Sequence, residues 1–151
     1  MASMNNGKVL ALFLNPKVGE IERKDALQIV AGSGIEGDMH FARPWRQVLF
    51  VSKEDLDFFG YGPGDWREQV TVDLPGLQAL PEGTPVTVGE IRFEVAYDCA
   101  PCNHLAKRLG EEPDAFVAKT TRRRGMFLNA TQSGTIRVGD AVRVSVGATN
   151  T

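Results

Sequence analysis

The sequence predicts a β-rich fold, a barrel or a sandwich that carries a few short helices. Short runs of β-branched and aromatic residues recur along the chain and are separated by Gly, Pro and Asp, as in proteins built from many short strands. Two pairs of runs are joined by Gly89-Glu90 and Gly139-Asp140, which favour the tight turn of a β-hairpin. Helical patterns are few, and nothing indicates the regular strand–helix alternation of a parallel sheet.

The expected strands and helices follow in chain order. Apolar or alternating character predicts strands at Lys8–Leu14, Ala26–Val30, Arg46–Ser52, Gln69–Asp73, Pro85–Val88, Ile91–Tyr97, Thr135–Val138 and Ala141–Val146. Ser52 is a typical helix cap, so a helix is expected over Lys53–Phe59, with acidic residues in its first turn. Two further helices are expected at Pro101–Gly110 and Pro113–Lys119, each with a proline near its start.

Length and charge limit the class of protein. The 151 residues suffice for one domain over residues 1–151, with a core from about residue 8 to residue 146 and frayed ends at Met1–Gly7 and Gly147–Thr151. A net charge of −2 argues against non-specific binding of nucleic acid. No run of about 20 apolar residues predicts a membrane span. The polar N-terminal segment lacks the apolar core of a signal peptide, so we expect a cytoplasmic protein.

The only two cysteines lie in Cys99-Ala-Pro-Cys102, between a predicted strand and a predicted helix. A thiol at a helix N-terminus faces unpaired N–H groups and the positive end of the helix dipole, which favour the reactive thiolate. In a reducing compartment this spacing favours a redox, metal-binding or catalytic role over a structural disulfide. Cys102 shares a helix face with Leu105 and Leu109, so a half-buried core cysteine is the alternative interpretation.

Two further groups of residues could carry chemistry. The glycine-rich segment Gly32–His40 permits a tight loop with Asp38 and His40 on or beside it, although both could simply stabilise the turn. Arginines at positions 43, 46, 67 and 122–124 offer planar forks for phosphate or carboxylate, and Arg46 and Arg67 lie in the less charge-dense segments. The set Cys99, Cys102, His40 and His104 has the residue types of a zinc site, but its spacing is not that of a zinc finger.

An ordered series of short motifs resembles one known family. The series is Gly34-Ile-Glu-Gly-Asp-Met-His40, Arg46-Gln-Val48, Trp66-Arg-Glu68, Pro101-Cys102, Gly134-Thr-Ile136 and Gly139-Asp140. It is similar to the stand-alone MOSC domain, the module named for the C-terminal region of molybdenum cofactor sulfurases. The resemblance runs from about Val9 to Val144, and the family fold that it implies is a β-barrel. Where the family often has Arg-Glu-Asn, this chain has Arg67-Glu68-Gln69.

The resemblance implies a role with the molybdenum cofactor, a pterin dithiolene that carries a phosphate. The family cysteine, which ligates molybdenum in the enzymes that reduce N-hydroxylated compounds, corresponds to Cys102 because it directly follows Pro101. Cys102 is therefore the expected catalytic residue and metal ligand. The expected cofactor-binding residues are Gly37, Asp38, His40, Arg46, Arg67 and Arg124. A soft thiolate suits such a metal, and arginines and loop amides suit the phosphate and the pterin edge. Pyridoxal phosphate is linked to the family only through the sulfurases.

Three functions remain open from the sequence. The first is a reductase, or a component of one, that receives electrons from a separate electron-donor protein. The second is a non-catalytic carrier of the cofactor, or a sulfur-transfer module. The third is a dithiol redox protein that uses Cys99 as its nucleophile, although the βαβ units that surround such a motif in thioredoxin are not predicted. The sequence does not indicate the oligomeric state.

Overall fold

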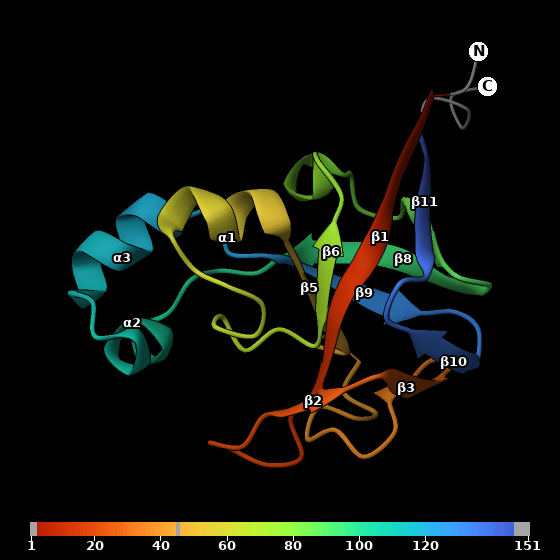
Figure 1. The fold of residues 1–151 in the computed structure, drawn as a ribbon, viewed down its shortest axis with the longest axis horizontal. Helices are drawn as coiled ribbons and strands as arrows, with labels where there is room; N and C mark the ends of the chain where they lie inside the picture. Colours follow the sequence, from red (N-terminus) through yellow and green to blue (C-terminus); the bar gives the residue numbers. More distant parts are fainter. Residues whose placement is uncertain (1–2, 45, 147–151) are drawn as a thin grey trace.

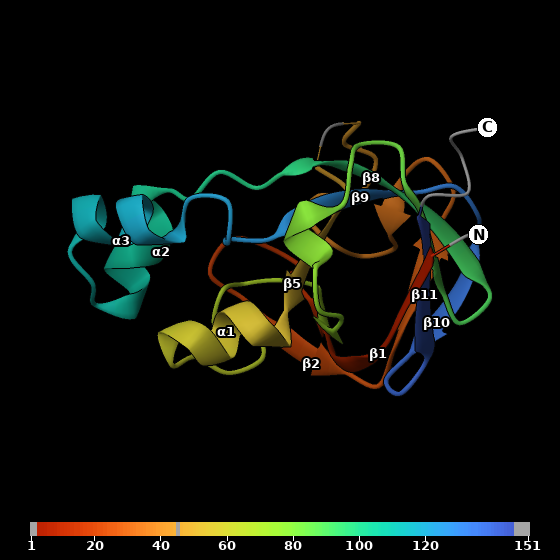
Figure 2. The same cartoon turned by 90° about the horizontal axis from the view of Figure 1, so that it is seen from above.

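The computed structural model describes residues 3–44 and 46–146, which form a β-barrel with three helices gathered at one end (Figure 1, Figure 2). The strands are β1 (Ser3–Leu14), β2 (Glu22–Lys24), β3 (Ala26–Val30), β4 (Gly34–Ile35), β5 (Val48–Ser52), β6 (Val70–Asp73), β7 (Pro85–Val88), β8 (Ile91–Asp98), β9 (Met126–Ala130), β10 (Gly134–Arg137) and β11 (Ala141–Val146). The helices are α1 (Lys53–Phe59), α2 (Asn103–Leu109) and α3 (Pro113–Thr120), with a short 3-10 turn at Leu77–Ala79.

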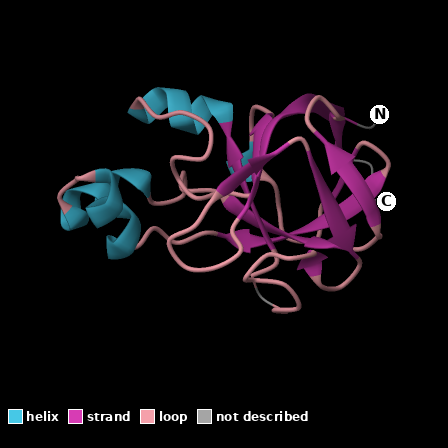
Figure 3. Ribbon diagram, turned by 60° about the horizontal axis from the view of Figure 1, so that its bottom comes forward, coloured by secondary structure: helices cyan, strands magenta, loops and turns pink. Residues whose placement is uncertain are grey.

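Strand β1 closes the barrel because it is long enough to pair with different strands along its length. Its first half pairs with β11, from Ser3 opposite Val146 to Lys8 opposite Ala141, and its second half pairs with β6 and β2. The closed order is β1-β11-β7-β8-β9-β5-β6, and the strands encircle a common interior in Figure 3. A smaller sheet has the order β10-β3-β4. The prediction of a β-rich barrel with a few short helices is confirmed.

Strand β5 separates two apolar clusters because side chains on both of its faces are buried. Val48 and Phe50 point into the barrel interior, whereas Leu49 and Val51 belong to a second cluster that includes Trp66 and side chains of all three helices. Alternate residues of a strand point to opposite faces, so one short strand anchors the helices to the barrel. The structure of the candidate site depends on this second cluster.

Most predicted elements agree with the structure to within two residues at either end, with two differences. The first strand begins at Ser3 rather than Lys8, so the expectation of a frayed N-terminal segment is wrong for residues 3–7, whose backbone pairs with β11. Residues 1–2 and 147–151, also expected to fray, lie outside the described residues. The second difference is that the sequence did not predict three strands, the short β2 and β4 and also β9, which pairs with both β5 and β8.

Candidate functional site

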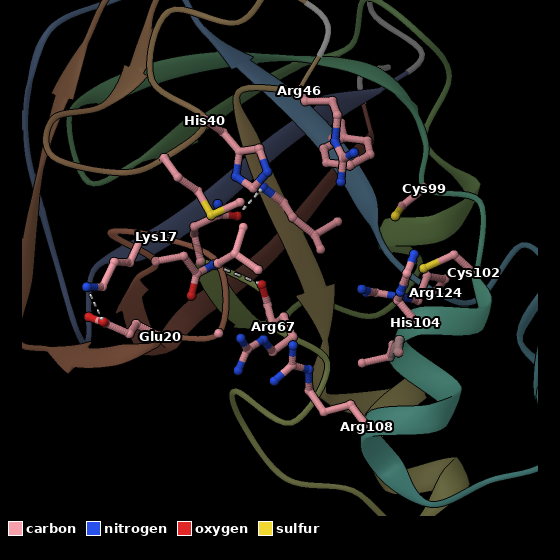
Figure 4. A pocket seen from close by; sticks show the side chains of 18 residues that line it. Lys17, Glu20, His40, Arg46, Arg67, Cys99, Cys102, His104, Arg108 and Arg124 are labelled. Atoms are coloured by element: carbon pink, nitrogen blue, oxygen red, sulfur yellow. Dashed lines mark hydrogen bonds and ion pairs between the residues drawn. The ribbon is translucent and has the colours of Figure 1, made fainter.

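A pocket of about 290 Å³ lies where the helices meet the barrel. Its walls come from the loops after β1 and β4, the segment before β6, helix α2 with the loop that precedes it, and the end of the α3–β9 connection. The charged, histidine and cysteine residues that line it are Lys17, Glu20, His40, Arg46, Arg67, Cys99, Cys102, His104, Arg108 and Arg124 (Figure 4). The pocket therefore combines both thiols of the chain with a group of cations.

The pocket contains five of the seven predicted site residues. Lining residues include Cys102, His40, Arg46, Arg67 and Arg124, which come from four separate parts of the sequence. Gly37 and Asp38 do not line this pocket. Gly37 has a positive φ of 88° and is exposed, and Asp38 is buried behind the pocket wall.

Asp38 positions the residues that form one wall of the pocket. Its carboxylate accepts hydrogen bonds from the backbone N of Asn15 at 3.0 Å and of His40 at 2.9 Å. It also contacts His40 Nδ1 at 3.2 Å and accepts from Gln69 Nε2 at 3.3 Å. Burial alone would raise the pKa of Asp38, but the hydrogen bonds from His40 and Asn15 outweigh it and hold that pKa below its ordinary value. The ionised form of Asp38 is thus part of the folded structure.

Arg67 adopts an unusual backbone conformation that fixes where its side chain points. Its φ is 62°, in the left-handed region that residues with a Cβ seldom occupy. The Arg67 carbonyl accepts a hydrogen bond from Asn15 Nδ2 at 3.2 Å, so the Asp38–Asn15 pair also supports this segment. Its neighbours Trp66 and Glu68 are fully buried, and the Arg67 side chain, which is half-buried, lines the pocket instead.

Arg124 is a buried cation without hydrogen-bond partners for two of its nitrogens. Only 7% of the residue is exposed, and neither Nε nor Nη1 has a partner among the described residues. The guanidinium carbon lies 5.9 Å from the centre of the Trp66 ring. Glu68, fully buried, is close enough for the Arg124 charge to act on it, yet burial dominates and raises the pKa of Glu68. A buried guanidinium with unpaired nitrogens is costly to a folded protein unless a ligand pairs with it.

Gly125 fixes the backbone beside Arg124, and we expect Gly125→Ala to lower the free energy of unfolding by about 2–4 kcal/mol. Gly125 has a φ of 138°, and a Cβ there would lie 2.9 Å from the carbonyl oxygen of Phe50. Gly110→Ala is the matched control, because Gly110 also has a positive φ (74°) but no neighbouring atom within 4 Å. It should cost about 1 kcal/mol. Urea unfolding of both variants tests this, and equal losses would contradict it.

The two cysteines differ sharply in accessibility. Cys99 is 6% exposed, its backbone N donates to the Gly125 carbonyl at 2.9 Å, and burial raises the pKa of its thiol. Cys102 is exposed and occupies the cap position before α2, where its side chain makes no capping hydrogen bond. Both are free thiols, and both sulfurs face the pocket in Figure 4. The exposed Cys102 is therefore the thiol that an incoming ligand can reach.

Several lining residues were not among the cofactor-binding residues expected from the sequence, and His104 was named there only in the zinc interpretation. Arg108 and His104 lie four residues apart and hence on the same face of α2, a spacing that could have been read from the predicted helix. Asn15 and Gln69 also line the pocket, and the Gln69 Oε1 accepts a hydrogen bond from Leu49 N at 2.8 Å. Only the tertiary structure places these two residues beside the cations.

Two interpretations of the sequence concerned a zinc site and a membrane-spanning segment. The four residues of the zinc interpretation all line the pocket, but in residues 3–44 and 46–146 no three His, Cys, Asp or Glu side chains form a group that could hold a metal ion. None of the helices described is long and apolar enough to cross a membrane.

Comparison with known proteins identifies the family. A sequence model of the MOSC domain matches residues 36–143. The chain belongs to the MOSC domain family. This family is associated with binding of the molybdenum cofactor. The match spans the predicted site residues from Gly37 to Arg124. A comparison of the sequence with curated proteins found no match.

Solved structures share the fold of this MOSC domain at low sequence identity. YuaD from Bacillus subtilis is 22% identical, with a TM-score of 0.81 over 96% of this chain and 98% of that one. YiiM from Escherichia coli is 16% identical, with a TM-score of 0.68 over 91% of this chain and 69% of that one. YiiM from Geobacillus stearothermophilus is 17% identical, with a TM-score of 0.68 over 97% and 78% of the two chains. At these identities the likeness establishes the fold alone.

Proposed function

We propose that this chain binds the molybdenum cofactor in the pocket, with the Cys102 thiolate as the protein ligand of the metal. We further propose that it acts as a reductase of N-hydroxylated substrates, or as a component of one. The observation that carries the proposal is an accessible thiol that shares a pocket with Arg124, a buried guanidinium with unpaired nitrogens. Such a pocket suits a ligand that has both a soft metal and an anionic part.

The residues present fit this cofactor. One protein thiolate is sufficient for a metal already held by dithiolene sulfurs, so the lack of a cluster of three ligating side chains in the described residues is no obstacle. Arg124 Nε and Nη1 are hydrogen-bond donors that have no acceptor among the described residues, so they could donate to an anionic part of the cofactor. Arg46 adds a further positive charge to the pocket wall. When bound, the cofactor would supply a redox-active metal for two-electron chemistry.

The chain's own residues would orient the substrate and supply a proton. Reduction of a hydroxylamine or an amidoxime takes up two electrons and two protons and releases water, and the electrons would come from a separate donor protein. His40 would hold such a proton, because it lines the pocket and the contact of its Nδ1 with Asp38 Oδ1 at 3.2 Å orients the ring. Leu49, Leu105 and Phe127 form an apolar wall that helps exclude water.

The dithiol alternative is disfavoured by the burial of Cys99. A dithiol redox site needs its first cysteine as an accessible thiolate, whereas Cys99 is 6% exposed and burial raises the pKa of its thiol. The carrier alternative uses the same thiol as the reductase. Only a measurement of turnover distinguishes the carrier from the reductase.

We expect Cys102→Ser to retain about tenfold less molybdenum per chain than the unmodified protein, or less still, because it removes the protein ligand of the metal. Expression in a cofactor-competent host, followed by elemental analysis and pterin fluorescence, measures the loss. Cys99→Ala is the matched control in the same pocket and should retain most of the metal. Equal molybdenum content in the unmodified protein and Cys102→Ser would refute the assignment.

Turnover separates the reductase from the carrier. The loaded protein, supplied with a reduced viologen as electron donor, should convert N-hydroxylaminopurine or an amidoxime to the corresponding amine or amidine. If the protein retains molybdenum but does not convert either substrate, the result supports the carrier function and contradicts the reductase. Cys102→Ser serves as the inactive control for background reduction by the dye.

A further inference from the structure

The segment between strands β8 and β9 supplies residues to the pocket from both of its ends. Cys99 and Cys102 follow β8, and Arg124 lies just before β9. Helices α2 and α3 lie between these ends, and Figure 2 shows β8 and β9 side by side where the chain leaves the barrel for the helices. Burial raises the pKa of the Cys99 thiol, and the charge of Arg124 opposes that rise, so the two ends already interact. How close the thiols lie to the guanidinium depends on what holds the two ends together.

The backbone provides only a short connection at this point. The last residue pair in the ladder between β8 and β9 is Asp98 opposite Met126. Beyond it, the Cys99 backbone N donates a hydrogen bond to the Gly125 carbonyl at 2.9 Å. Among the described residues this is the last backbone hydrogen bond between the two ends, so their separation needs a further contact.

The side chain of Gln78 supplies that contact. Its Nε2 donates to Asp98 Oδ1 and, at 2.7 Å, to the Gly125 carbonyl. A primary amide has two N–H groups, so this nitrogen uses one for the last residue of β8 and the other for the residue before β9. The Gly125 carbonyl thereby accepts from both Gln78 Nε2 and Cys99 N. Gln78 thus joins the two ends directly beside their last backbone hydrogen bond.

Gln78 is itself held by elements outside this segment. It is the middle residue of the 3-10 turn Leu77–Ala79, in which Leu77 is buried in the barrel interior. The backbone N of Gly76, just before the turn, donates to Glu54 Oε2 of helix α1 at 3.0 Å. The position of Gln78 is therefore set by the barrel and by α1, independently of α2 and α3.

We propose that Gln78 is a positioning residue that holds the Arg124 guanidinium near the thiol of Cys102. Gln78 does not line the pocket, so it acts through Asp98 and Gly125. Loss of its two hydrogen bonds lets the ends of the segment move apart, and the Arg124 charge then acts less strongly on the thiol. The inference rests on the proposed function only where it concerns the cofactor.

Two alkylating reagents test the inference on the metal-free chain. Iodoacetate and iodoacetamide both alkylate a thiolate with loss of iodide, but only iodoacetate is an anion, so the ratio of their rate constants rises with positive potential at the thiol. The measurement uses a Cys99→Ala background, in which Cys102 is the one cysteine. Gln78→Met has a side chain of the same length without donors, and it should lower the ratio about threefold or more, toward the value in Arg124→Met. A ratio unchanged by either substitution overturns the inference.

Gln132→Met is the matched control at the opposite end of the same two strands. Gln132 Oε1 accepts from Arg92 N at 3.0 Å, and Gln132 does not line the pocket. This variant also loses a side-chain hydrogen bond of the β8–β9 pair, but it should leave the ratio unchanged. An equal fall in Gln132→Met overturns the inference, because the effect would then come from strand pairing in general. If Gln78→Met does not fold, Gln78→Asn replaces it, since its amide is one methylene shorter and does not span both acceptors.

The molybdenum content of Gln78→Met, expressed in a cofactor-competent host, separates this inference from the proposed function. A content about tenfold below that of the unmodified protein, together with a lowered ratio, supports both. If no form of the chain retains molybdenum but the ratio falls as described, the proposed function fails and the role of Gln78 stands. If the unmodified protein retains molybdenum and the ratio is unchanged in Gln78→Met, the role of Gln78 fails and the proposed function stands.

Discussion

Replacement of Asp38 by alanine is expected to lower the free energy of unfolding by about 3–5 kcal/mol at neutral pH. The buried carboxylate accepts from two backbone N–H groups, those of Asn15 and His40, and from the side chain of Gln69. Removal of the carboxylate leaves these donors without their partner in a buried environment. Urea unfolding measures the loss. Asp140→Ala is the control, because Asp140 accepts from Arg137 N at 2.8 Å in an exposed turn, and it should cost about 1 kcal/mol.

The contribution of Asp38 to the free energy of unfolding should decrease as the pH falls. Its pKa in the folded protein lies below the ordinary value, so its contribution to stability is fully present above the unfolded-state pKa. The contribution is lost as the pH falls through the folded-state pKa. The difference in stability between the unmodified protein and Asp38→Ala should therefore be constant above about pH 5 and narrow below about pH 4. A difference that widens at low pH would contradict the ionised role of Asp38.

Asp38 was expected among the cofactor-binding residues because its loop belongs to the series of motifs that resembles the MOSC family, whereas the loop pattern alone also allowed a role in the turn. The segment that ends in Asp38 and His40 is a loop rich in glycine and polar groups, and such loops bind ligands in many proteins. In the structure His40 lines the pocket, whereas Asp38 lies behind it and holds His40 and Asn15 in place. A sequence pattern does not distinguish a residue that contacts a ligand from one that supports it, because both are polar and lie in the same loop.

The fold was predictable wherever the local pattern and the tertiary environment agree. Buried residues alternate with partly or fully exposed ones in strand β7 and in residues 141–144 of β11, and a Gly-containing turn defines one end of each strand. Strand β9 was missed because Met126–Ala130 is nearly continuously buried and contains no β-branched residue. Residues 3–7 of β1 are mostly polar, and they form a strand because β11 offers them a backbone partner.

The candidate site was predictable to the extent that its residues lie in family motifs. Cys102, Arg67 and His40 belong to such motifs, and the structure brings all three to one pocket. Arg108 lies on a short amphipathic helix in a position that resembles any solvated surface arginine. It becomes a candidate only because the structure places it in the wall of the pocket with Arg67. This placement depends on how α2 packs against the barrel, which local sequence does not encode.

Replacement of Arg124 by methionine is expected to lower retention of the molybdenum cofactor about 10- to 100-fold, because a charge-assisted hydrogen bond contributes about 1.5–3 kcal/mol. The same variant without cofactor should still fold, since methionine fills similar space and no hydrogen bond from Arg124 Nε or Nη1 is lost. Elemental analysis and urea unfolding on the same preparations measure the two effects. Arg122→Met is the control: Arg122 is exposed, has a φ of 65° and does not line the pocket.

The pH dependence of the free energy of unfolding of Arg124→Met shows whether loss of the Arg124 charge changes the pKa of Glu68. Burial raises the pKa of Glu68 and the Arg124 charge opposes that rise, so the variant should have a still higher Glu68 pKa. An acid whose pKa is raised on folding stabilises the protein least at high pH, so Arg124→Met should lose stability relative to the unmodified protein as the pH rises from about 5 to 8. The double variant Arg124→Met/Glu68→Gln, which removes both buried charges, should lack this loss. An unchanged pH profile in Arg124→Met would mean that Arg124 and Glu68 do not interact. Full cofactor retention would mean that the unpaired nitrogens of Arg124 do not bind the ligand.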